Sequence, residues 1–352
     1  MNKATITGCL LGTAVGDSMG LPYEGMSVRR TAKFFKRPAQ QRFIFGKGMI
    51  SDDSEHACFI AQALLGSLDN PDRFEQKLAW SLRWWFLGLP AGIGLATAKS
   101  IIKLWLGFPP RYSGVFSAGN GPAMRSPLLG VVYARNIEQL KVFVRRSTRL
   151  THTDPKAYFG ALAVALAARQ SSLSQQVDAK DFLAVVRRAL TGERDHEFDR
   201  LMRMTIDSVL RGDSLQQFAV LIGCQQGISG YIYHTVPCVL HCWLRHQRDF
   251  ATGLEELIAA GGDTDSNGAI FGAICGAGVG KTGIPETWLE DIVDWPRSTV
   301  YMEKLADRLA QACAGDPAGQ APRYFAPGIL FRNLLFLTAV LLHGCRRLLP
   351  PY

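Results

Sequence analysis

"GCLLGTAVGDSMG" at residues 8–20 and "GAIFGAICGAGVG" at residues 268–280 share the pattern that decides the fold. A glycine inside a helix costs roughly 1 kcal/mol relative to alanine, so a whole stripe of them requires a compensating gain. Close approach of two backbones supplies such a gain, as in small-xxx-small packing. The pattern therefore predicts two deeply buried helices in tight contact with their neighbours. The glycines recur every four residues, at Gly8, Gly12, Gly16 and Gly20 and at Gly268, Gly272, Gly276 and Gly280.

Apolar residues at three-to-four spacing indicate helices along most of the chain, and alternating β-branched runs are few. We therefore expect an all-α fold, a single compact multi-helix domain. A stretch rich in Pro, Gly and Ala at residues 313–327 separates this domain, residues 1–312, from a tail at residues 313–352 made of a loop and a short apolar helix. The predicted helices include residues 55–67, 73–86, 155–169, 179–190, 199–210, 235–245 and 288–312.

The composition is that of a globular protein with a basic surface. The 352 residues are 47% hydrophobic and carry a formal net charge of +9. The basic residues form small clusters, and no recognisable nucleic-acid motif accompanies them, so solvated faces are expected rather than a nucleic-acid partner. The eight cysteines form no CxxC pair and lie mostly in apolar surroundings. This usage indicates reduced, buried thiols in a cytoplasmic protein.

One stretch, "HTVPCVLHCWLRH", offers four possible zinc ligands on one helix face: His234, Cys238, Cys242 and His246. Ligands on consecutive turns cannot easily converge on one ion, because each turn rises about 5.4 Å. We expect a buried stripe, with a metal site as the alternative.

The two ends of the chain carry weak targeting features. Residues 1–11 loosely resemble a short signal peptide, but Asp17 follows closely and no clean cleavage region is present. The apolar core at residues 334–342 is shorter than the ~20 residues that span a bilayer. We expect a packed helix there. Peripheral membrane contact, with Arg346 and Arg347 at the headgroups, is a further possibility.

Two acidic motifs each precede an apolar stretch. "SDDS" at residues 51–54 places Asp52 and Asp53 between two serines. In "GGDTDSNGAI" at residues 261–270, Asp263 and Asp265 flank Thr264, and Ser266 follows. Helix capping explains either motif alone: Ser51 or Asp52 can be the cap, and a capping box from Asp52 to Glu55 fits the spacing. If the motifs converge, their carboxylates and hydroxyls suit Mg²⁺ or Mn²⁺.

These motifs, with three others in the same order, resemble the ADP-ribosylglycohydrolase family, whose arginine-directed members include the dinitrogenase reductase-activating enzymes. "GCLLGTAVGDSMGLPYEG" resembles the family's opening helix and acidic loop, and "SDDS" resembles its Thr-Asp-Asp-Thr. "GNGPAMRSPLLG" at residues 119–130 resembles its substrate loop. "THTDPKAYFGALAVALA" at residues 151–167 resembles its histidine-bearing segment, and "GGDTDSNGAI" its second metal motif.

The resemblance implies a dinuclear site with two Mg²⁺ or Mn²⁺ ions inside the all-α domain. Ser51 and Ser266 stand where the family usually has threonine, and serine keeps the hydroxyl. Glu24 matches the acidic loop residue, a candidate for proton management, and is assigned to catalysis with Asp52 and Asp53. The implied metal ligands are Ser51, Asp52, Asp53, Asp263, Asp265 and Ser266.

The resemblance also implies a cleft for ADP-ribose. Glycine at residues 119 and 121 would permit close approach of the ligand to backbone. Arg125 would either hold the loop or meet a phosphate, and His152 would contact the ribose or diphosphate, with a locally bonded histidine as its alternative. The implied substrate-binding residues are Gly119, Asn120, Gly121, Met124, Arg125 and His152.

The implied activity is metal-dependent hydrolysis that removes ADP-ribose from modified protein side chains, with arginine favoured. The partners are then an ADP-ribosylated protein as substrate and ADP-ribose as product. Two alternatives remain open: a catalytically silent binding or structural relative, as the family's lens crystallins are, and a hydrolase of free ADP-ribose derivatives or another dinuclear-metal hydrolase.

Overall fold

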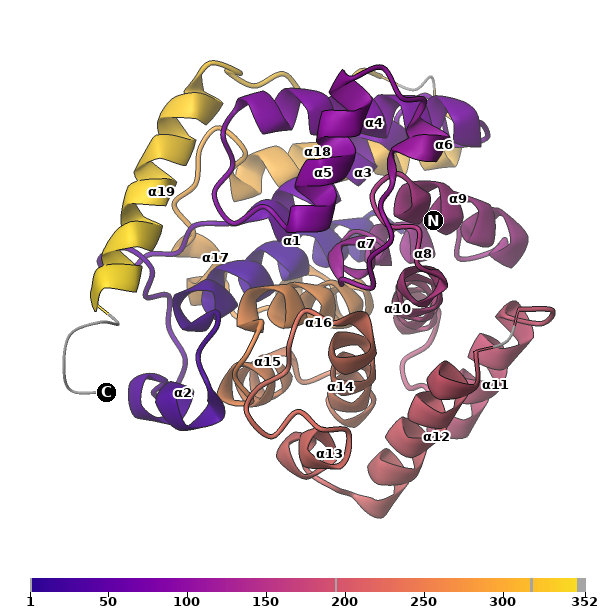
Figure 1. The fold of residues 1–352 in the computed structure, drawn as a ribbon, viewed down its shortest axis with the longest axis vertical. Helices are drawn as coiled ribbons and strands as arrows, with labels where there is room; N and C mark the ends of the chain where they lie inside the picture. Colours follow the sequence, from indigo (N-terminus) through magenta and orange to yellow (C-terminus); the bar gives the residue numbers. More distant parts are fainter. Residues whose placement is uncertain (1, 194, 317–318, 347–352) are drawn as a thin grey trace.

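A computed structural model describes residues 2–193, 195–316 and 319–346, and within these ranges helices dominate (Figure 1). The described residues form isolated β-bridges and no strand, which confirms the all-α prediction. The helices are α1 (Lys3–Gly20), η1 (Leu21–Tyr23), α2 (Val28–Phe34), α3 (Asp52–Leu64), α4 (Pro71–Leu87), α5 (Leu95–Trp105), α6 (Pro110–Ser113), α7 (Gly121–Met124), α8 (Pro127–Val132), α9 (Ile137–Arg149), α10 (Pro155–Leu173), α11 (Ala179–Ala189), α12 (His196–Arg211), α13 (Leu215–Leu221), α14 (Ile232–Arg245), α15 (Phe250–Ala259), α16 (Thr264–Val279), η2 (Lys281–Gly283), α17 (Glu286–Glu290), α18 (Thr299–Ala314) and α19 (Gly328–Arg346).

The two glycine-striped helices, α1 and α16, lie side by side at the centre of the molecule and run antiparallel (Figure 1). A Cβ atom on Gly12 would lie 2.0 Å from the carbonyl oxygen of Gly272, and a Cβ on Gly272 would lie 2.1 Å from that of Gly12. Gly8 meets Gly276 in the same way. The stripes therefore pack against each other, and the predicted close backbone contact is confirmed.

Other helices enclose this central pair. α10, α14 and α15 pack against α16, and α3 and α18 pack against α1. A further close backbone approach joins α8 to α10, since a Cβ on Gly130 would lie 1.9 Å from the carbonyl oxygen of Ala165. Most side chains of α1, α10 and α16 are buried, which explains why these helices are apolar on every face.

The packing brings two helix starts to the end of α1. The Thr264 hydroxyl, at the start of α16, donates to the carbonyl oxygen of Gly20, the last residue of α1 (2.8 Å). The backbone N–H of Ser51, just before α3, donates to Asp17 Oδ2 near the same end (2.8 Å). The residues that follow Ser51 and Thr264 are thereby placed close together.

The predicted helix over residues 288–312 is wrong. The structure has a short helix, α17, that ends at Glu290, and a second, α18, that begins at Thr299. The peptide bond between Trp295 and Pro296 is cis, and a proline in a helix interior removes a backbone donor and clashes with the preceding turn. The prediction was wrong because the apolar residues keep a helical spacing across the segment between α17 and α18.

The predicted tail contains the loop and the helix α19, at the left edge in Figure 1. The helix spans Gly328–Arg346, longer than the predicted apolar core. Its window Gly328–Cys345 has a mean hydropathy of 1.6, so by length and composition α19 could cross a membrane. Only 28% of this window is buried. Arg347 lies outside the described residues.

Candidate active site

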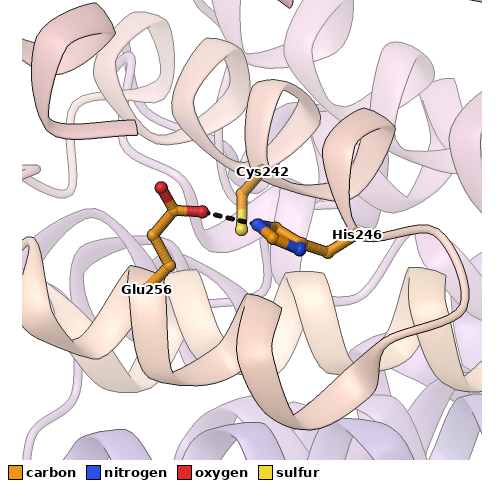
Figure 2. A group of neighbouring side chains, drawn as sticks. All are labelled: Cys242, His246 and Glu256. Atoms are coloured by element: carbon orange, nitrogen blue, oxygen red, sulfur yellow. Dashed lines mark hydrogen bonds and ion pairs between the residues drawn. The ribbon is translucent and has the colours of Figure 1, made fainter. Parts of the chain in front are cut away.

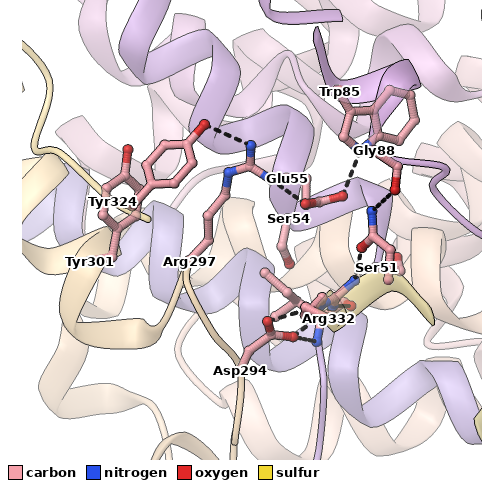
Figure 3. A network of polar contacts seen from close by, with 12 residues as sticks. Ser51, Ser54, Glu55, Trp85, Gly88, Asp294, Arg297, Tyr301, Tyr324 and Arg332 are labelled. Carbon is pink, nitrogen blue, oxygen red and sulfur yellow. Dashed lines mark hydrogen bonds and ion pairs between the residues drawn. The ribbon is translucent and has the colours of Figure 1, made fainter. Parts of the chain in front are cut away.

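The first acidic motif forms the start of α3. Ser51 is the N-cap and accepts a hydrogen bond from the Asp53 backbone N–H (3.4 Å), so the alternative with Asp52 as the cap is wrong. The predicted capping box is wrong as well, because Glu55 does not turn back to the cap. Its carboxylate instead accepts hydrogen bonds from Arg297 and from Trp85 Nε1, the latter at 2.6 Å (Figure 3).

The second acidic motif forms the start of α16 and meets the first. Asp263 is at the N-cap position but its side chain makes no capping bond, and the Ser266 backbone N–H donates to Asp265 Oδ1 (2.9 Å). The Ser266 hydroxyl donates to Asp53 Oδ2 (3.2 Å), across 213 residues of sequence. The Ser51 hydroxyl donates to the same oxygen (3.3 Å). The expected convergence of the two motifs is therefore present.

A further carboxylate, Asp17, belongs to this cluster and was not among the predicted site residues. It is fully buried, and its Oδ2 accepts hydrogen bonds from the backbone N–H groups of Ser51 (2.8 Å) and Ser54 (3.1 Å) and from the Ser54 hydroxyl (2.5 Å). Asp17 thus holds the turn that carries the first motif. In the sequence, Asp17 stands out only as a polar residue within a helix predicted to be buried, and the glycine stripe around it does not indicate a place in the site.

The aspartates raise one another's pKa. Burial, followed by the charges of Asp52, Asp17 and Asp263, raises the pKa of Asp53 well above its usual value. Burial, then the charges of Glu24 and Asp263, raises the pKa of Asp265 in the same direction. Burial and mutual repulsion therefore both disfavour the ionised forms of these carboxyl groups. A cation bound among them would offset the cost of burial and the repulsion.

Glu24 lies in the loop between η1 and α2, and its side chain is exposed. The loop is fixed to the second motif by two backbone hydrogen bonds, from Gly25 N–H to the oxygen of Gly262 and from Gly262 N–H to the oxygen of Met26, both 2.7 Å. The negative charge of Glu24 also contributes to the raised pKa of Asp52, after burial and the charges of Asp17 and Glu55. Glu24 is therefore an exposed carboxylate that is near enough to the acidic cluster for its charge to act there.

The predicted substrate loop joins the acidic cluster directly. Asn120, just before α7, donates from Nδ2 to Asp263 Oδ2 (2.7 Å) and to the Thr235 hydroxyl (3.1 Å). Its backbone N–H donates to the carbonyl oxygen of Gly230 (2.9 Å). Gly119 forms an isolated bridge with Tyr231. The loop is therefore tied on one side to α14 and on the other to the start of α16.

His152 lies against the two glycines of this loop. A Cβ on Gly119 would lie 3.1 Å from His152 Nε2, and a Cβ on Gly121 would lie 3.2 Å from His152 Cε1. The ring is buried, and its Nδ1 is 2.9 Å from the Thr151 hydroxyl. Burial, aided by the positive charge of Arg125, lowers the pKa of His152 to about 3. The imidazole is therefore neutral at physiological pH.

Arg125 has the contacts of a loop support. Its side chain is buried, with Nε donating to the Ser147 hydroxyl (3.0 Å) and Nη2 to the Ser147 carbonyl oxygen (2.7 Å) and the Thr151 hydroxyl (2.5 Å). Thr151 in turn contacts His152. Met124, at the end of α7, is also buried beneath the loop. Both side chains thus lie behind the loop, and neither is exposed on its surface.

The four-residue Cys/His stripe does not converge on one point. Its second half, Cys242 and His246, meets Glu256 of α15, which sequence reasoning had not included (Figure 2). One ligand atom from each lies within 4.8 Å of the others, and no other group of three Cys, His, Asp or Glu residues among the described parts of the chain is that close. No three aspartates of the two motifs therefore lie as close together as this group does.

Glu256 is already satisfied by the protein. It accepts hydrogen bonds from His246 Nε2 (2.7 Å), from Arg245 Nη1 (2.8 and 3.1 Å) and from the Leu215 backbone N–H (2.9 Å). The Cys242 thiol donates to the carbonyl oxygen of Gly253 (3.2 Å). The group therefore fastens α14 to α15 and α13. All eight cysteines are free thiols; six are buried, whereas Cys313 is half-buried and Cys345 is exposed.

The fold and the site together define a class of protein: a helical domain that gathers carboxylates and hydroxyls at two helix starts, beside a glycine-rich loop and a neutral histidine. The profile of the ADP-ribosylglycohydrolase family matches residues 2–319, and the chain belongs to this family. It is accordingly an ADP-ribosylhydrolase, an enzyme that hydrolyses glycosidic bonds of ADP-ribose. The matched residues end before α19.

Two curated relatives and one solved structure agree with this assignment. ADP-ribosylhydrolase ARH3 of Gallus gallus is 25% identical over 336 residues, covering 81% of this chain and 88% of the relative. ADP-ribosyl-[dinitrogen reductase] glycohydrolase of Rhodospirillum rubrum is 25% identical over 292 residues, covering 81% and 89%. A solved structure, an ADP-ribosylglycohydrolase-related protein complex, superposes with a TM-score of 0.63 at 26% identity, covering 88% of this chain and 98% of that one.

Proposed function

We propose that this enzyme is a metal-dependent hydrolase that removes ADP-ribose from modified protein side chains, with arginine as the favoured linkage. One observation carries the proposal: the Asn120 side chain donates to Asp263 Oδ2 (2.7 Å). This bond joins the glycine loop, with the features of a nucleotide-binding loop, to the acidic cluster, with the features of a metal centre. A ligand on the loop would therefore have its reactive end at the carboxylates.

The donors of the cluster fit a hard divalent cation. The six proposed ligands from the two motifs offer carboxylate and hydroxyl oxygens only, the ligand type that Mg²⁺ and Mn²⁺ prefer. Asp53 Oδ1 is buried and has no hydrogen-bond partner, a costly arrangement unless the oxygen meets a cation. Two ions, held by the residues of the two motifs, would balance the clustered charge. The ligands we propose are Ser51, Asp52, Asp53, Asp263, Asp265 and Ser266.

When bound, divalent cations would supply charge stabilisation for the ribose hydroxyls and a water of lowered pKa. The protein side chains and loops would bind and orient the substrate. Gly119 and Gly121 let His152 pack closely against the loop, because neither has a Cβ, and the ribose or diphosphate would meet the loop backbone beside this imidazole. The neutral imidazole can donate or accept a hydrogen bond there without adding charge. Arg125 is a positioning residue, since it holds Thr151, which contacts the imidazole.

The departing side chain would leave at the exposed side of the cluster. Cleavage of the bond to the anomeric carbon develops positive charge on the sugar, which nearby carboxylates such as Asp52 and Asp53 stabilise. Glu24 is exposed and its charge acts on the same cluster, so it would exchange a proton with solvent and with the leaving group. A guanidinium is cationic, so the surplus of carboxylates favours arginine over a neutral leaving group. The Rhodospirillum relative is named for a protein substrate.

The experiment offers a panel of conjugates to protein stripped of metal with a chelator. The panel contains ADP-ribosyl-arginine and ADP-ribosyl-serine peptides and free O-acetyl-ADP-ribose, each without metal, with Mg²⁺ or with Mn²⁺. We expect ADP-ribose release from the arginine peptide only when metal is returned. Asp53→Asn should abolish it, whereas Asp207→Asn, an exposed aspartate of α12, should not.

Two results would overturn parts of the proposal. Turnover of the free derivative alone would establish the alternative of a small-molecule hydrolase. Undiminished release in the presence of chelator would remove the metal from the reaction.

A further inference from the structure

The helix α19, outside the residues that the family profile matches, turns a broad apolar face to solvent. Its inner face buries the polar side chains of Arg332 and Asn333 together with the apolar Phe336 and Ala339. Its outer face presents large apolar side chains to solvent, with Phe331 70% and Leu342 65% exposed. A surface helix normally turns its charged side chains outward. The exposed apolar residues are Leu330, Phe331, Leu334, Leu335, Leu337, Leu341 and Leu342.

The inner face is fastened to the domain by polar contacts. Arg332 pairs with Asp294 (2.6 Å), and Asn333 donates to the carbonyl oxygen of Gly88 (2.7 Å) (Figure 3). Further along, Phe336 packs on Phe43 with ring centroids 5.2 Å apart. These contacts hold α19 flat against the domain, with its outer face parallel to the surface. The helix is therefore placed to lie on a partner rather than to insert end-on.

A second exposed apolar group adjoins the far end of α19. The chain turns tightly between Ile44 and Lys47, which pair in an isolated bridge, and the side chain of Phe45 at the tip is fully exposed with φ 46°. Non-glycine residues rarely adopt this left-handed region. The turn is linked to α19 through His343, whose ring stacks on Phe43 at 5.1 Å and whose Nε2 meets the Phe43 oxygen at 2.6 Å.

The segment that carries this turn is strongly basic. Residues 33–47 contain five basic residues and no acidic one. All five are exposed: Lys33, Lys36, Arg37, Arg42 and Lys47. Two of them have acidic partners, Arg37 with Glu255 and Lys47 with Asp291. Figure 1 shows α2, which precedes most of the segment, along the same edge as the lower end of α19. Arg42 and Lys47 are exposed on either side of the turn that His343 links to α19, so positive charge borders the apolar face there.

We infer that the outer face of α19 and the Phe45 turn form a docking surface for an anionic lipid bilayer, on which the enzyme lies peripherally. An apolar face that enters the boundary between headgroups and acyl chains, bordered by Lys and Arg that meet the lipid headgroups, is the pattern of an interfacial helix. The basic border favours an anionic lipid surface over a second copy of this chain, which would bring like charge to like charge. The inference is independent of the proposed substrate and metals.

The test is co-sedimentation of the full-length protein with vesicles of phosphatidylcholine, alone or mixed with phosphatidylglycerol. We expect binding to the mixed vesicles, weakened by salt. The triple variant Phe331→Ser, Leu334→Ser, Leu341→Ser should lower the partition coefficient about tenfold or more, because side chains that would enter the bilayer are lost. The pair Lys33→Glu and Lys36→Glu should remove the preference for phosphatidylglycerol.

A matched control makes the same type of change elsewhere. Leu210, Val220 and Leu221 are exposed to a similar degree on α12 and α13, and their replacement by Ser should leave vesicle binding unchanged. Equal loss in this control, or no binding of the wild type to mixed vesicles, would overturn the inference. So would a wild-type dimer that the α19 variant converts to monomer, since a second copy would then cover the face. Resistance of membrane-bound protein to carbonate extraction would show a spanning helix instead.

Discussion

Arg332 of α19 donates a hydrogen bond to the carbonyl oxygen of Ile50, the residue before the N-cap Ser51. The backbone N–H of Ile50 donates to Asp294 Oδ2 (3.0 Å), and Arg332 and Asp294 are themselves an ion pair. Both backbone polar groups of Ile50 are therefore held by one buried pair, Arg332 and Asp294, which Figure 3 shows. A helix outside the matched family region thus fixes the segment that leads into the first acidic motif.

Replacement of Arg332 should test this link. Arg332→Met leaves the Asp294 carboxylate buried without its cation, so we expect a loss of about 3–5 kcal/mol in the free energy of unfolding. Mn²⁺ affinity should fall as well, because the turn before Ser51 is released. Chemical denaturation and calorimetry measure the two effects.

The control is Arg203→Met, which removes a partner from an exposed ion pair with Asp199 (2.9 Å). We expect it to cost at most about 1 kcal/mol and to leave metal affinity unchanged. Adding Asp294→Leu to Arg332→Met should recover part of the lost stability, since the unpaired charge is gone. If Arg332→Met destabilises the protein but leaves metal affinity unchanged, the side chain supports the fold alone.

The contact between α1 and α16 makes a sharp prediction about stability. Gly272→Ala adds a Cβ that would lie 2.1 Å from the carbonyl oxygen of Gly12. The helices must separate along their whole length, and we expect a loss of about 3 kcal/mol or more. Gly344→Ala, at a helical glycine of α19 with open space around it, should be neutral or stabilising by up to about 1 kcal/mol. Similar melting temperatures for the two variants would contradict the close packing.

The glycine loop should set the affinity for ADP-ribose. Gly121→Val places a branched side chain where even a Cβ would lie 3.2 Å from His152 Cε1. Either the imidazole moves or the ligand loses its room, so we expect calorimetry to show weaker ADP-ribose binding with little change in melting temperature. Unchanged affinity would show that the ligand lies elsewhere.

The neutral imidazole of His152 predicts a pH dependence of stability. Because burial lowers its pKa to about 3, the unfolded chain takes up a proton below about pH 6.5 and the folded protein does not. This group's contribution is therefore full above pH 6.5 and decreases as the pH falls, by up to about 1.4 kcal/mol per pH unit. His152→Gln should show a smaller decrease between pH 7 and pH 5 in denaturant titrations. Parallel curves for the two proteins would mean that the histidine titrates alike in both states.

The local sequence pattern was sufficient to predict the structure where a residue type repeats along one helix. The glycine stripes predicted a close helix contact because mid-helix glycine has a known cost, and the structure adds only that the two stripes meet each other. The prediction of one helix over residues 288–312 was wrong because it relied on local pattern alone. The apolar periodicity continues across Pro296, but the helix is interrupted there. Apolar periodicity indicates which face of a helix is buried. Where the helix ends depends on the backbone, for example on a proline that lacks the N–H donor.

The site residues that sequence reasoning missed are those whose roles depend on distant partners. Asp17 supports a turn 34 residues away, and Arg332 contacts Ile50 across 282 residues. Asp17 lies inside the first glycine stripe, but the stripe predicts helix packing and no partner for this carboxylate, and Arg332 lies in no distinctive local pattern. Asp53 and Ser266 were found although 213 residues separate them, because each belongs to a motif of the same composition and because the whole series of motifs resembles one family. The capping box from Asp52 failed because Glu55 had a stronger partner in Arg297.

The first acidic motif offers the decisive test of the proposed metal site. Ser51 is the N-cap of α3, so capping no longer explains Asp52. As a carboxylate in the first turn, Asp52 would contribute about 0.3–1 kcal/mol through the helix dipole. As a ligand, Asp52→Asn should lower metal affinity and turnover together, by about tenfold to a hundredfold or more, on the scale known for perturbed metal sites.

Asp265→Asn, on the other helix, should give the same phenotype as Asp52→Asn. The double variant should cost little beyond either single one, because both residues would serve one site and effects within a shared site are not additive. Without metal, both variants should be at least as stable as the wild type, since burial and neighbouring carboxylates raise the pKa of each aspartate and oppose its ionised form. The measurements are hydrolysis of ADP-ribosyl-arginine, bound Mn²⁺, and melting temperature with and without metal. Near-normal hydrolysis by Asp52→Asn at saturating metal, or independent and additive losses from the two changes, would refute a shared cluster.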